Sequence, residues 1–300
     1  MGEHSEIAWT DGTFNPWWGC TRVSPGCVHC YAESFAKRTG NLVWGTQAPR
    51  RFFGDKHWAE PLKWNRAAEK AGKRMRVFCA SMADVFEDRD DPKPHRERLW
   101  ALINDTPWLD WQLLTKRPEN IMPMWNDALK RCWVGATVES QEQVRRALYL
   151  LDLDVTVRFL SIEPMLGTVD LSEVEYVAPA PPYGPGVWAN VLTGHIIGPD
   201  EVLDRKVDWV IVGGESGHGA RRCHVDWIRS IVRQCKEAGT AVFVKQLGAR
   251  PKLGDGSWHK VPVLSNHPAT RNEIVLKDRK GGDMSEWPED LRVQQFPEVK

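Results

Sequence analysis

The sequence predicts an α/β protein built on a full or partial (β/α) barrel. Short apolar runs, rich in β-branched and aromatic residues, recur along the chain, and each is followed by polar or charged residues. Segments with helical periodicity lie between these runs. The runs are apolar throughout instead of alternating with polar residues, which is typical of parallel strands buried on both faces.

Six apolar runs are predicted to form the main strands, and an earlier strand is expected at residues 7–10. The six runs cover residues 76–80, 111–114, 132–136, 157–160, 209–212 and 241–244. About seven strands fit a full or partial barrel, and a doubly wound open sheet is the alternative. In either fold the residues that follow the strands gather at one edge of the sheet, where ligands bind.

Three helices are predicted between the strands, at residues 94–103, 140–151 and 226–238. The second would begin with a capping box, because Ser140 is followed by Gln143 in the required spacing. The third has its apolar residues on one face and is followed by Gly239, a residue type that commonly ends helices.

Residues 1–249 are predicted to form the barrel-like domain, and residues 250–300 a C-terminal cap or tail. The domain would carry a cysteine loop at residues 14–32 and an insertion at about residues 167–206. The insertion contains a proline-rich stretch and is interpreted as a loop or lid, because it lacks the pattern of a barrel unit. In the tail, the runs Val261–Val263 and Glu273–Leu276 suggest a small hairpin over the barrel.

Composition and charge argue against several classes of protein. Of the 300 residues, 42% are hydrophobic and 27% are charged, which is typical of a globular protein with a sizeable core. Forty basic residues balance forty acidic ones, which argues against a dedicated, strongly basic nucleic-acid-binding protein. No apolar run suits a membrane-spanning helix, and the N-terminal residues do not resemble a signal peptide, so a cytoplasmic location is expected.

Three of the seven cysteines, Cys20, Cys27 and Cys30, lie close together in the pattern C-x6-C-x2-C. A Pro-Gly pair between them allows a sharp turn, so the sulfur atoms can converge, and converging thiolates need a soft metal to be stable. A structural zinc site normally has four protein ligands, with His29 as a possible fourth here. Three thiolates would instead leave one iron of a 4Fe–4S cluster open to another ligand.

The other four cysteines are expected to be small buried hydrophobic residues: Cys79, Cys132, Cys223 and Cys235. The adjacent Cys223 and His224 are an alternative pair of metal ligands. An odd number of cysteines in a chain without an export signal argues against a disulfide framework.

The cysteine pattern resembles that of the radical S-adenosylmethionine (SAM) enzymes, in which three cysteines share a loop and an aromatic residue, here His29, precedes the last one. That superfamily also has a full or partial β/α barrel. The resemblance implies that Cys20, Cys27 and Cys30 hold a 4Fe–4S cluster whose open iron binds SAM. It also implies an electron donor such as flavodoxin or ferredoxin, because the reduced cluster cleaves SAM to a 5′-deoxyadenosyl radical that abstracts hydrogen from a substrate.

Two features differ from the pattern of that superfamily. Its usual spacing is C-x3-C-x2-C, whereas the first gap here is longer. Its Gly-Gly-Glu motif follows an early strand and holds the amino group of SAM, whereas Gly213-Gly214-Glu215 follows a late strand. Glu215 would therefore contact either SAM or the substrate, and a tight turn is an alternative role for the two glycines.

Motifs along nearly the whole chain carry a second resemblance. They are Phe14–Cys20, Cys27–Glu33, Leu114–Pro118, Ser161–Pro164, Gly213–Gly217, Lys280–Asp283 and Trp287–Pro288. These motifs resemble a phage-associated family of uncharacterised proteins with a three-cysteine motif, which is distantly similar to the radical SAM superfamily. The resemblance implies a phage-infected or prophage-bearing bacterial host and, by analogy, a substrate that is DNA, RNA or a nucleotide.

The residues that follow the predicted strands are the candidates for contact with SAM and substrate. Four charged residues are expected to act in catalysis: Lys116, Glu163, Glu215 and Lys245. The following residues are expected to bind the cofactor: Ser81, Asp84, Thr137, Glu139, Gly213, Gly214, Glu215 and Ser216. Taken individually, Asp84, Glu139 and Glu163 would also fit helix caps or solvated loops.

Two other functions are alternatives. The first is a zinc-stabilised barrel that binds nucleic acid without radical chemistry, using basic and tryptophan side chains near the strand ends. The second is a cofactor-free barrel hydrolase with Glu163 and Glu215 as paired carboxylates. The hydrolase would leave the three clustered cysteines without a role.

Overall fold

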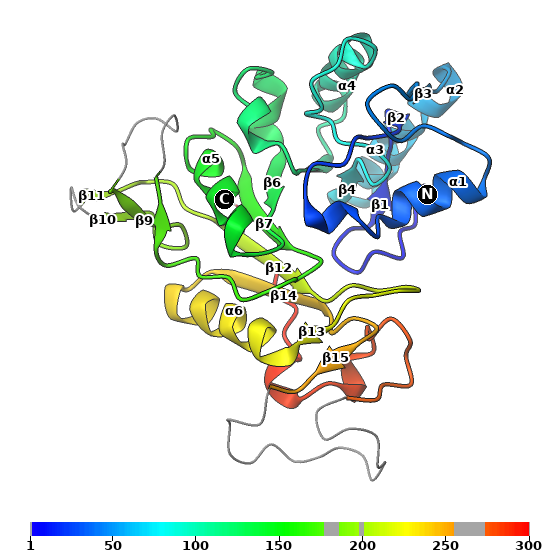
Figure 1. The fold of residues 1–300 in the computed structure, drawn as a ribbon. Coiled ribbons are helices and arrows are strands. Elements are labelled where there is room, and N and C mark those ends of the chain that lie inside the picture. The colour runs from blue at the N-terminus through cyan, green and yellow to red at the C-terminus, as the bar shows by residue number, and fades with distance from the viewer. Residues whose placement is uncertain (1, 177–185, 198–200, 255–273, 300) are drawn as a thin grey trace. The chain divides into compact units, whose positions relative to one another are not determined.

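Seven parallel strands form the main sheet of the computed structural model, in the order β1-β4-β5-β6-β7-β12-β14 (Figure 1). They are β1 (Gly12–Thr13), β4 (Met75–Cys79), β5 (Leu109–Thr115), β6 (Trp133–Thr137), β7 (Val157–Ile162), β12 (Trp209–Gly213) and β14 (Ala241–Gln246). The order follows the chain, as in a β/α barrel, whereas the order of a doubly wound sheet reverses at a switch point. The predicted partial β/α barrel is confirmed, and the doubly wound alternative is excluded.

The structure describes residues 2–176, 186–197, 201–254 and 274–299. Its α-helices are α1 (Tyr31–Arg38), α2 (Asp55–Trp58), α3 (Glu60–Ala71), α4 (Lys93–Asp105), α5 (Leu148–Leu151) and α6 (Val225–Ala238). Its 3-10 helices are η1 (Pro25–Cys27), η2 (Pro118–Asn120), η3 (Asp127–Arg131), η4 (Gln141–Ala147), η5 (Met284–Glu286) and η6 (Glu289–Leu291). None of the helices in these ranges is long and apolar enough to cross a membrane.

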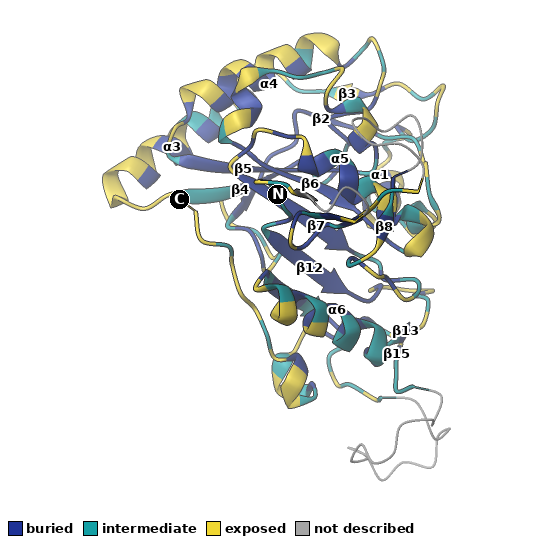
Figure 2. Ribbon diagram, turned by 90° about the vertical axis from the view of Figure 1, so that its left-hand side faces the viewer, coloured by how far each residue is buried: buried dark blue, intermediate teal, exposed yellow. Residues whose placement is uncertain are grey.

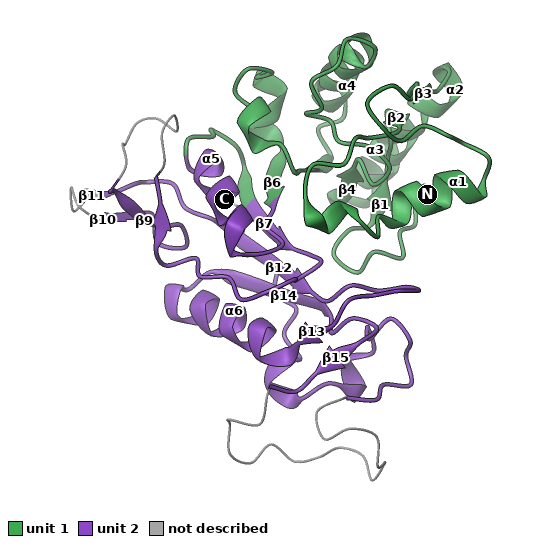
Figure 3. Ribbon diagram, in the orientation of Figure 1, with its two compact units in different colours: residues 1–136, 152–158, 299–300 green, residues 137–151, 159–298 purple. Residues whose placement is uncertain are grey.

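The chain divides into two compact units (Figure 3). Unit 1 comprises Met1–Ala136, Asp152–Arg158 and Val299–Lys300, and unit 2 comprises Thr137–Leu151 and Phe159–Glu298. Unit 1 therefore holds β1, β4, β5 and the four helices α1 to α4, whereas β12, β14, α5 and α6 belong to unit 2.

The six long apolar runs form strands where the sequence predicts them, because their side chains are buried on both faces of the sheet. Every residue of β6, β7 and β12 is buried. In Figure 2 these strands are dark blue, whereas the outer faces of α3 and α4 are yellow. The strand expected at residues 7–10 is wrong: the backbone N–H of Thr10 donates to the carbonyl of Ile7 and closes a turn there. The first strand is β1 instead, which pairs with Val77 and Phe78 of β4.

The predicted helices at 94–103 and 226–238 are confirmed as α4 and α6, and Gly239 ends α6 with φ +65°. The segment 140–151 is helical but consists of the 3-10 helix η4 followed by the short α5. The expected capping box is absent, because the Ser140 side chain makes no capping hydrogen bond. The sequence patterns missed α1, α2 and α3.

Three small sheets accompany the main one. In unit 1, β2 (Trp17–Trp18) pairs with β3 (Arg51–Phe52) in antiparallel orientation. In unit 2, the predicted insertion contains a four-stranded antiparallel sheet, and β13 (Cys223–His224) pairs with β15 (Pro251–Lys252). The four strands of the insertion are β8 (Val174–Glu175), β9 (Trp188–Asn190), β10 (His195–Ile197) and β11 (Glu201–Val202).

The C-terminal segment lies along the outer edge of β14. The backbone of Val244 donates to Val293, and that of Gln295 donates to Val242, both at 2.9 Å. Residues 261–263 and 273, part of the predicted hairpin, lie outside the described residues, and residues 274–276 form no strand. Trp287 is 1% exposed, and its Nε1 donates to the carbonyl of Gly281 at 3.0 Å. The segment is thus packed into unit 2, where it protects the edge of the sheet.

Replacing Trp287 by alanine should therefore lower the free energy of unfolding by about 3–5 kcal/mol, because the substitution leaves a large cavity. Trp188→Ala provides the control, since Trp188 is 38% exposed and less apolar area is lost there. Urea unfolding monitored by circular dichroism measures both variants. Equal, small effects would show that the C-terminal segment is not an integral part of the fold.

Candidate functional site

The three clustered cysteines lie on the segment between β2 and α1, within unit 1. This segment starts beside the residues that follow β4: Gly19 forms a parallel bridge with Ala83, and its N–H donates to Met82 at 2.9 Å. Gly19 has φ +118°, and a Cβ atom there would lie 2.4 Å from the carbonyl oxygen of Val43. Only glycine fits this close approach. The cysteine segment therefore begins at the carboxyl end of a parallel strand, where β/α proteins place their sites.

Cys30 lies at the N-terminal end of α1, where it is the N-cap residue. Burial raises the pKa of its thiol, while the backbone N–H groups of Glu33 and Ala32 and the charge of Lys116 act in the opposite direction. Cys27, which ends η1, also raises the pKa of Cys30 through its charge, so the two thiols interact. The helix N-terminus and Lys116 thus offer positive charge to a thiolate at Cys30.

Cys20 is held by an arginine. Arg117 Nη1 lies 3.7 Å from Cys20 Sγ, and Nη2 donates to the carbonyl of the next residue, Thr21, at 2.6 Å. Burial raises the pKa of Cys20 to about 12, with a further contribution from Asp84 and an opposing one from Arg117. In the metal-free chain Cys20 is therefore protonated at neutral pH, and metal binding would release its proton.

A buried ion pair supports this part of the chain. Arg50 forms two hydrogen bonds with Glu87, at 2.9 and 2.8 Å, and both side chains are at most 3% exposed. The Arg50 guanidinium also donates to the carbonyls of Val43 and Ala48 and to the hydroxyl of Thr21. Arg50 thus connects the residues after α1 with the start of the cysteine segment.

The predicted site residues that follow β4 in unit 1, Ser81 and Asp84, also form hydrogen bonds in this part of the chain. Asp84 accepts hydrogen bonds from Thr115, Phe86, Lys116 and Arg117, so its carboxylate holds other parts of the site in place. The hydroxyl of Ser81 accepts from Asn15 Nδ2, and its carbonyl accepts from the Tyr31 hydroxyl. These contacts bring Asp84 next to Arg117, the cation that contacts Cys20, and join Ser81 to Tyr31, the first residue of α1.

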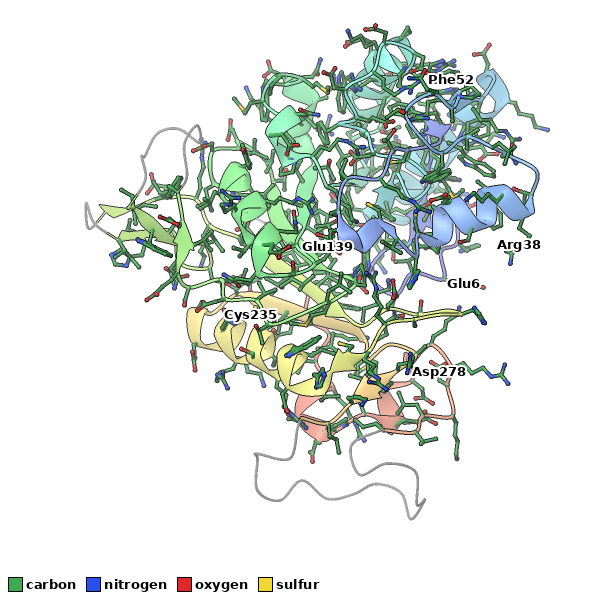
Figure 4. The ribbon with its side chains drawn as sticks, viewed as in Figure 1. Glu6, Arg38, Phe52, Glu139, Cys235 and Asp278 are labelled. Carbon is green, nitrogen blue, oxygen red and sulfur yellow. The ribbon has the colours of Figure 1, made fainter. Side chains whose placement is uncertain are left out.

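The strand-end candidates of unit 2 form separate contacts. Lys245 Nζ lies 3.2 Å from Glu163 Oε1, and these side chains are 28% and 13% exposed. Glu139, labelled in Figure 4, accepts a hydrogen bond of 2.7 Å from Arg146. Thr137 Oγ1 is buried and has no hydrogen-bond partner among the described residues. The pair Glu163–Lys245 offers a carboxylate and an ammonium group to a ligand of unit 2.

The Gly-Gly-Glu-Ser segment of unit 2 is closely packed against its own unit. Both oxygens of Glu215 accept hydrogen bonds from the guanidinium of Arg221, and one also accepts its backbone N–H. A Cβ atom on Gly213 would lie 2.9 Å from Glu163 Oε1, and one on Gly214 would lie 2.3 Å from the carbonyl of Leu247. Ser216 is exposed. Packing and the Glu215–Arg221 contact therefore account for Gly213, Gly214 and Glu215 without a ligand.

Among the described residues, no group of three or more His, Cys, Asp or Glu side chains is placed to hold one metal ion. The chemistry of the donors nevertheless fits a metal–sulfur group: three thiols share one short segment, and an N–H donor of Arg117 faces the sulfur atom of Cys20. Cys79, Cys132, Cys223 and Cys235 are buried, as predicted for small hydrophobic residues. Burial raises the pKa of Cys223 to about 12.

Sequence reasoning missed Arg50, Glu87 and Arg117. Arg117 stands next to the predicted Lys116, in the polar run that follows β5, so the position carried a signal. Arg50 and Glu87 lie in segments without periodicity, and only their burial in the structure distinguishes them from surface charges.

The fold and these residues define an α/β protein with a partial β/α barrel and a three-cysteine segment at the carboxyl end of a parallel strand. The chain belongs to the family described as "Protein of unknown function (DUF5131)", whose family model matches residues 4–282. Searches of curated proteins and of solved structures found no match. The family match includes all three clustered cysteines, and it shows no link to phages or to the radical SAM superfamily.

Replacing Arg50 by methionine should destabilise the protein by about 3–5 kcal/mol, because it leaves the Glu87 carboxylate buried and unpaired. Arg66→Met is the control, since Arg66 is exposed on α3 and its loss should change stability by less than about 0.5 kcal/mol. Urea unfolding monitored by circular dichroism gives both values. A small effect of Arg50→Met would contradict a supporting role for the Arg50–Glu87 pair.

Gly214→Ala should cost about 1–3 kcal/mol even without any ligand, because the added methyl group meets the backbone at Leu247. A Cβ atom on Gly167 meets no atom within 4 Å, so Gly167→Ala should be close to neutral. Thermal unfolding of the metal-free protein compares the two. If Gly214→Ala is as stable as Gly167→Ala, packing does not explain this glycine.

Proposed function

We propose that the protein is an iron–sulfur enzyme of the radical SAM type, in which Cys20, Cys27 and Cys30 hold a 4Fe–4S cluster. One observation carries the proposal: three thiols share one short segment that starts at the carboxyl end of β4, and an N–H donor of Arg117 lies 3.7 Å from the sulfur atom of Cys20. Hydrogen bonds of this kind are a recurrent feature of cysteine-bound iron–sulfur clusters.

The donor set favours a cluster over structural zinc. Structural zinc normally takes four protein ligands, whereas this segment supplies three cysteines. The nearest other candidate in the sequence, His29, is exposed and directly precedes Cys30. Because His29 and Cys30 are adjacent in the sequence, their side chains are poorly placed to bind the same ion.

A 4Fe–4S cluster bound by three thiolates would supply one electron from a donor protein such as flavodoxin or ferredoxin, cleaving SAM to methionine and a 5′-deoxyadenosyl radical that takes a hydrogen atom from the substrate. Within unit 1, Lys116 would attract a ligand carboxylate or phosphate, since its charge already acts on Cys30. Within unit 2, Glu163 and Lys245 would bind oppositely charged groups of a ligand. The substrate that we propose is a nucleic acid or nucleotide in a phage-infected or prophage-bearing bacterium.

The proposal predicts that protein reconstituted without oxygen binds about four iron and four sulfide per chain. With dithionite and SAM it should then release 5′-deoxyadenosine, detected by liquid chromatography and mass spectrometry. Cys20→Ala, Cys27→Ala and Cys30→Ala should each lose the cluster and this activity. Cys235→Ala is the matched control and should keep both, because Cys235 is buried in α6 of unit 2 (Figure 4).

Stoichiometric zinc without iron, or unchanged iron content in all three cysteine variants, would contradict the proposal. The zinc result would favour a zinc-stabilised barrel that binds nucleic acid. That alternative requires DNA or RNA binding that weakens steeply as salt rises, together with no cleavage of SAM.

A further inference from the structure

The guanidinium group of Arg117 is the N–H donor that contacts the first of the three clustered cysteines. The Arg117 side chain is only 8% exposed. Its Nη1 atom lies 3.7 Å from Cys20 Sγ and 2.9 Å from Asp84 Oδ2, and its Nη2 atom donates to the carbonyl of Thr21. One side chain therefore joins the first cysteine, the residue after it and the segment that follows β4.

The direction of this guanidinium is set by Asp84. Oδ1 of Asp84 accepts from the Thr115 hydroxyl at 2.7 Å and from the N–H of Phe86 at 3.0 Å. Oδ2 accepts from the N–H of Lys116 at 3.2 Å as well as from Arg117. Because the carboxylate is held on both oxygens, it fixes the planar guanidinium, whose Nη1 faces both the carboxylate and the sulfur. A lysine ammonium group does not reproduce this rigid arrangement of donors.

Arg50 is a natural comparison for Arg117. It is also a buried arginine paired with a carboxylate, and it also contacts Thr21, through the hydroxyl at 3.1 Å. Among the contacts of the described residues, none joins Arg50 to a sulfur atom. Both arginines are therefore buried, paired with a carboxylate and in contact with Thr21. Only Arg117 contacts the sulfur atom of Cys20.

We propose that Arg117 is a positioning residue that holds Cys20 Sγ in place at the metal–sulfur centre and donates an N–H···S hydrogen bond to it. This inference rests on the proposed function. Hydrogen bonds to the sulfur atoms, and nearby positive charge, stabilise the more negative, reduced form of an iron–sulfur centre. Arg117 therefore raises the reduction potential of the centre.

The test is a comparison of Arg117→Lys with Arg50→Lys in the reconstituted full chain. Both substitutions keep the positive charge, but only the first removes the fixed donor to Cys20. A redox titration followed by electron paramagnetic resonance should give a more negative midpoint potential for Arg117→Lys. The potential of Arg50→Lys should shift less than that of Arg117→Lys, because Arg50 supports the cysteine segment without contacting a sulfur atom. Equal potentials in all three proteins, or equal shifts in both variants, would overturn the inference.

A second pair of variants covers the case in which Arg117→Lys does not fold. Asp84→Asn is compared with the double variant Asp84→Asn/Arg117→Met, which leaves no buried, unpaired carboxylate at residue 84. The double variant should have the more negative potential and should lose iron faster to a chelator. Identical values in the two proteins would overturn the inference. If the protein without substitutions binds no iron, the proposed function itself is contradicted. If it binds iron but the variants have the same midpoint potential as the protein without substitutions, only this inference is contradicted.

Discussion

Burial of two arginine–carboxylate pairs is the constraint on which the cysteine segment depends. Charged side chains in a protein interior are costly unless they are paired and their remaining donors and acceptors are satisfied. Arg50 and Glu87, and Arg117 and Asp84, meet this requirement through backbone carbonyls, backbone N–H groups and hydroxyls. Each of these hydrogen bonds has a preferred geometry. The network therefore fixes the backbone path of the cysteine segment, which has little regular secondary structure. The positions of the cysteines therefore depend on this network of hydrogen bonds.

The sequence predicted the main sheet well because buried parallel strands are apolar throughout, a pattern that depends on burial alone. The first strand was misplaced because local hydrogen bonds at Thr10 form a turn within an apolar run. The helix α1 was missed because it begins after a cysteine, which is not among the residues that usually cap helices. The helix α3 carried usable signals, with Pro61 in its first turn and Gly72 at its end, but its apolar stripe is interrupted.

The candidate site was predicted only in part. Three cysteines in a short segment are visible in the sequence because their chemistry requires proximity. The cation that contacts Cys20 could not be identified from the sequence, since the polar run after β5 contains both Lys116 and Arg117. Which of two adjacent residues turns toward the sulfur depends on the fixed Asp84 carboxylate, which comes from another segment of the chain. The partner of Glu215 could not be predicted from the sequence either: its carboxylate accepts a hydrogen bond from Arg221, which lies in the same loop.

The pairing of β14 with the C-terminal segment has a consequence for biosynthesis. Gln294 contacts Val244 across a sequence separation of 50 residues, so the outer edge of β14 stays open while that stretch leaves the ribosome. An uncovered strand edge is a template for pairing with other chains. During this interval a nascent chain therefore presents an unpaired strand edge to neighbouring chains.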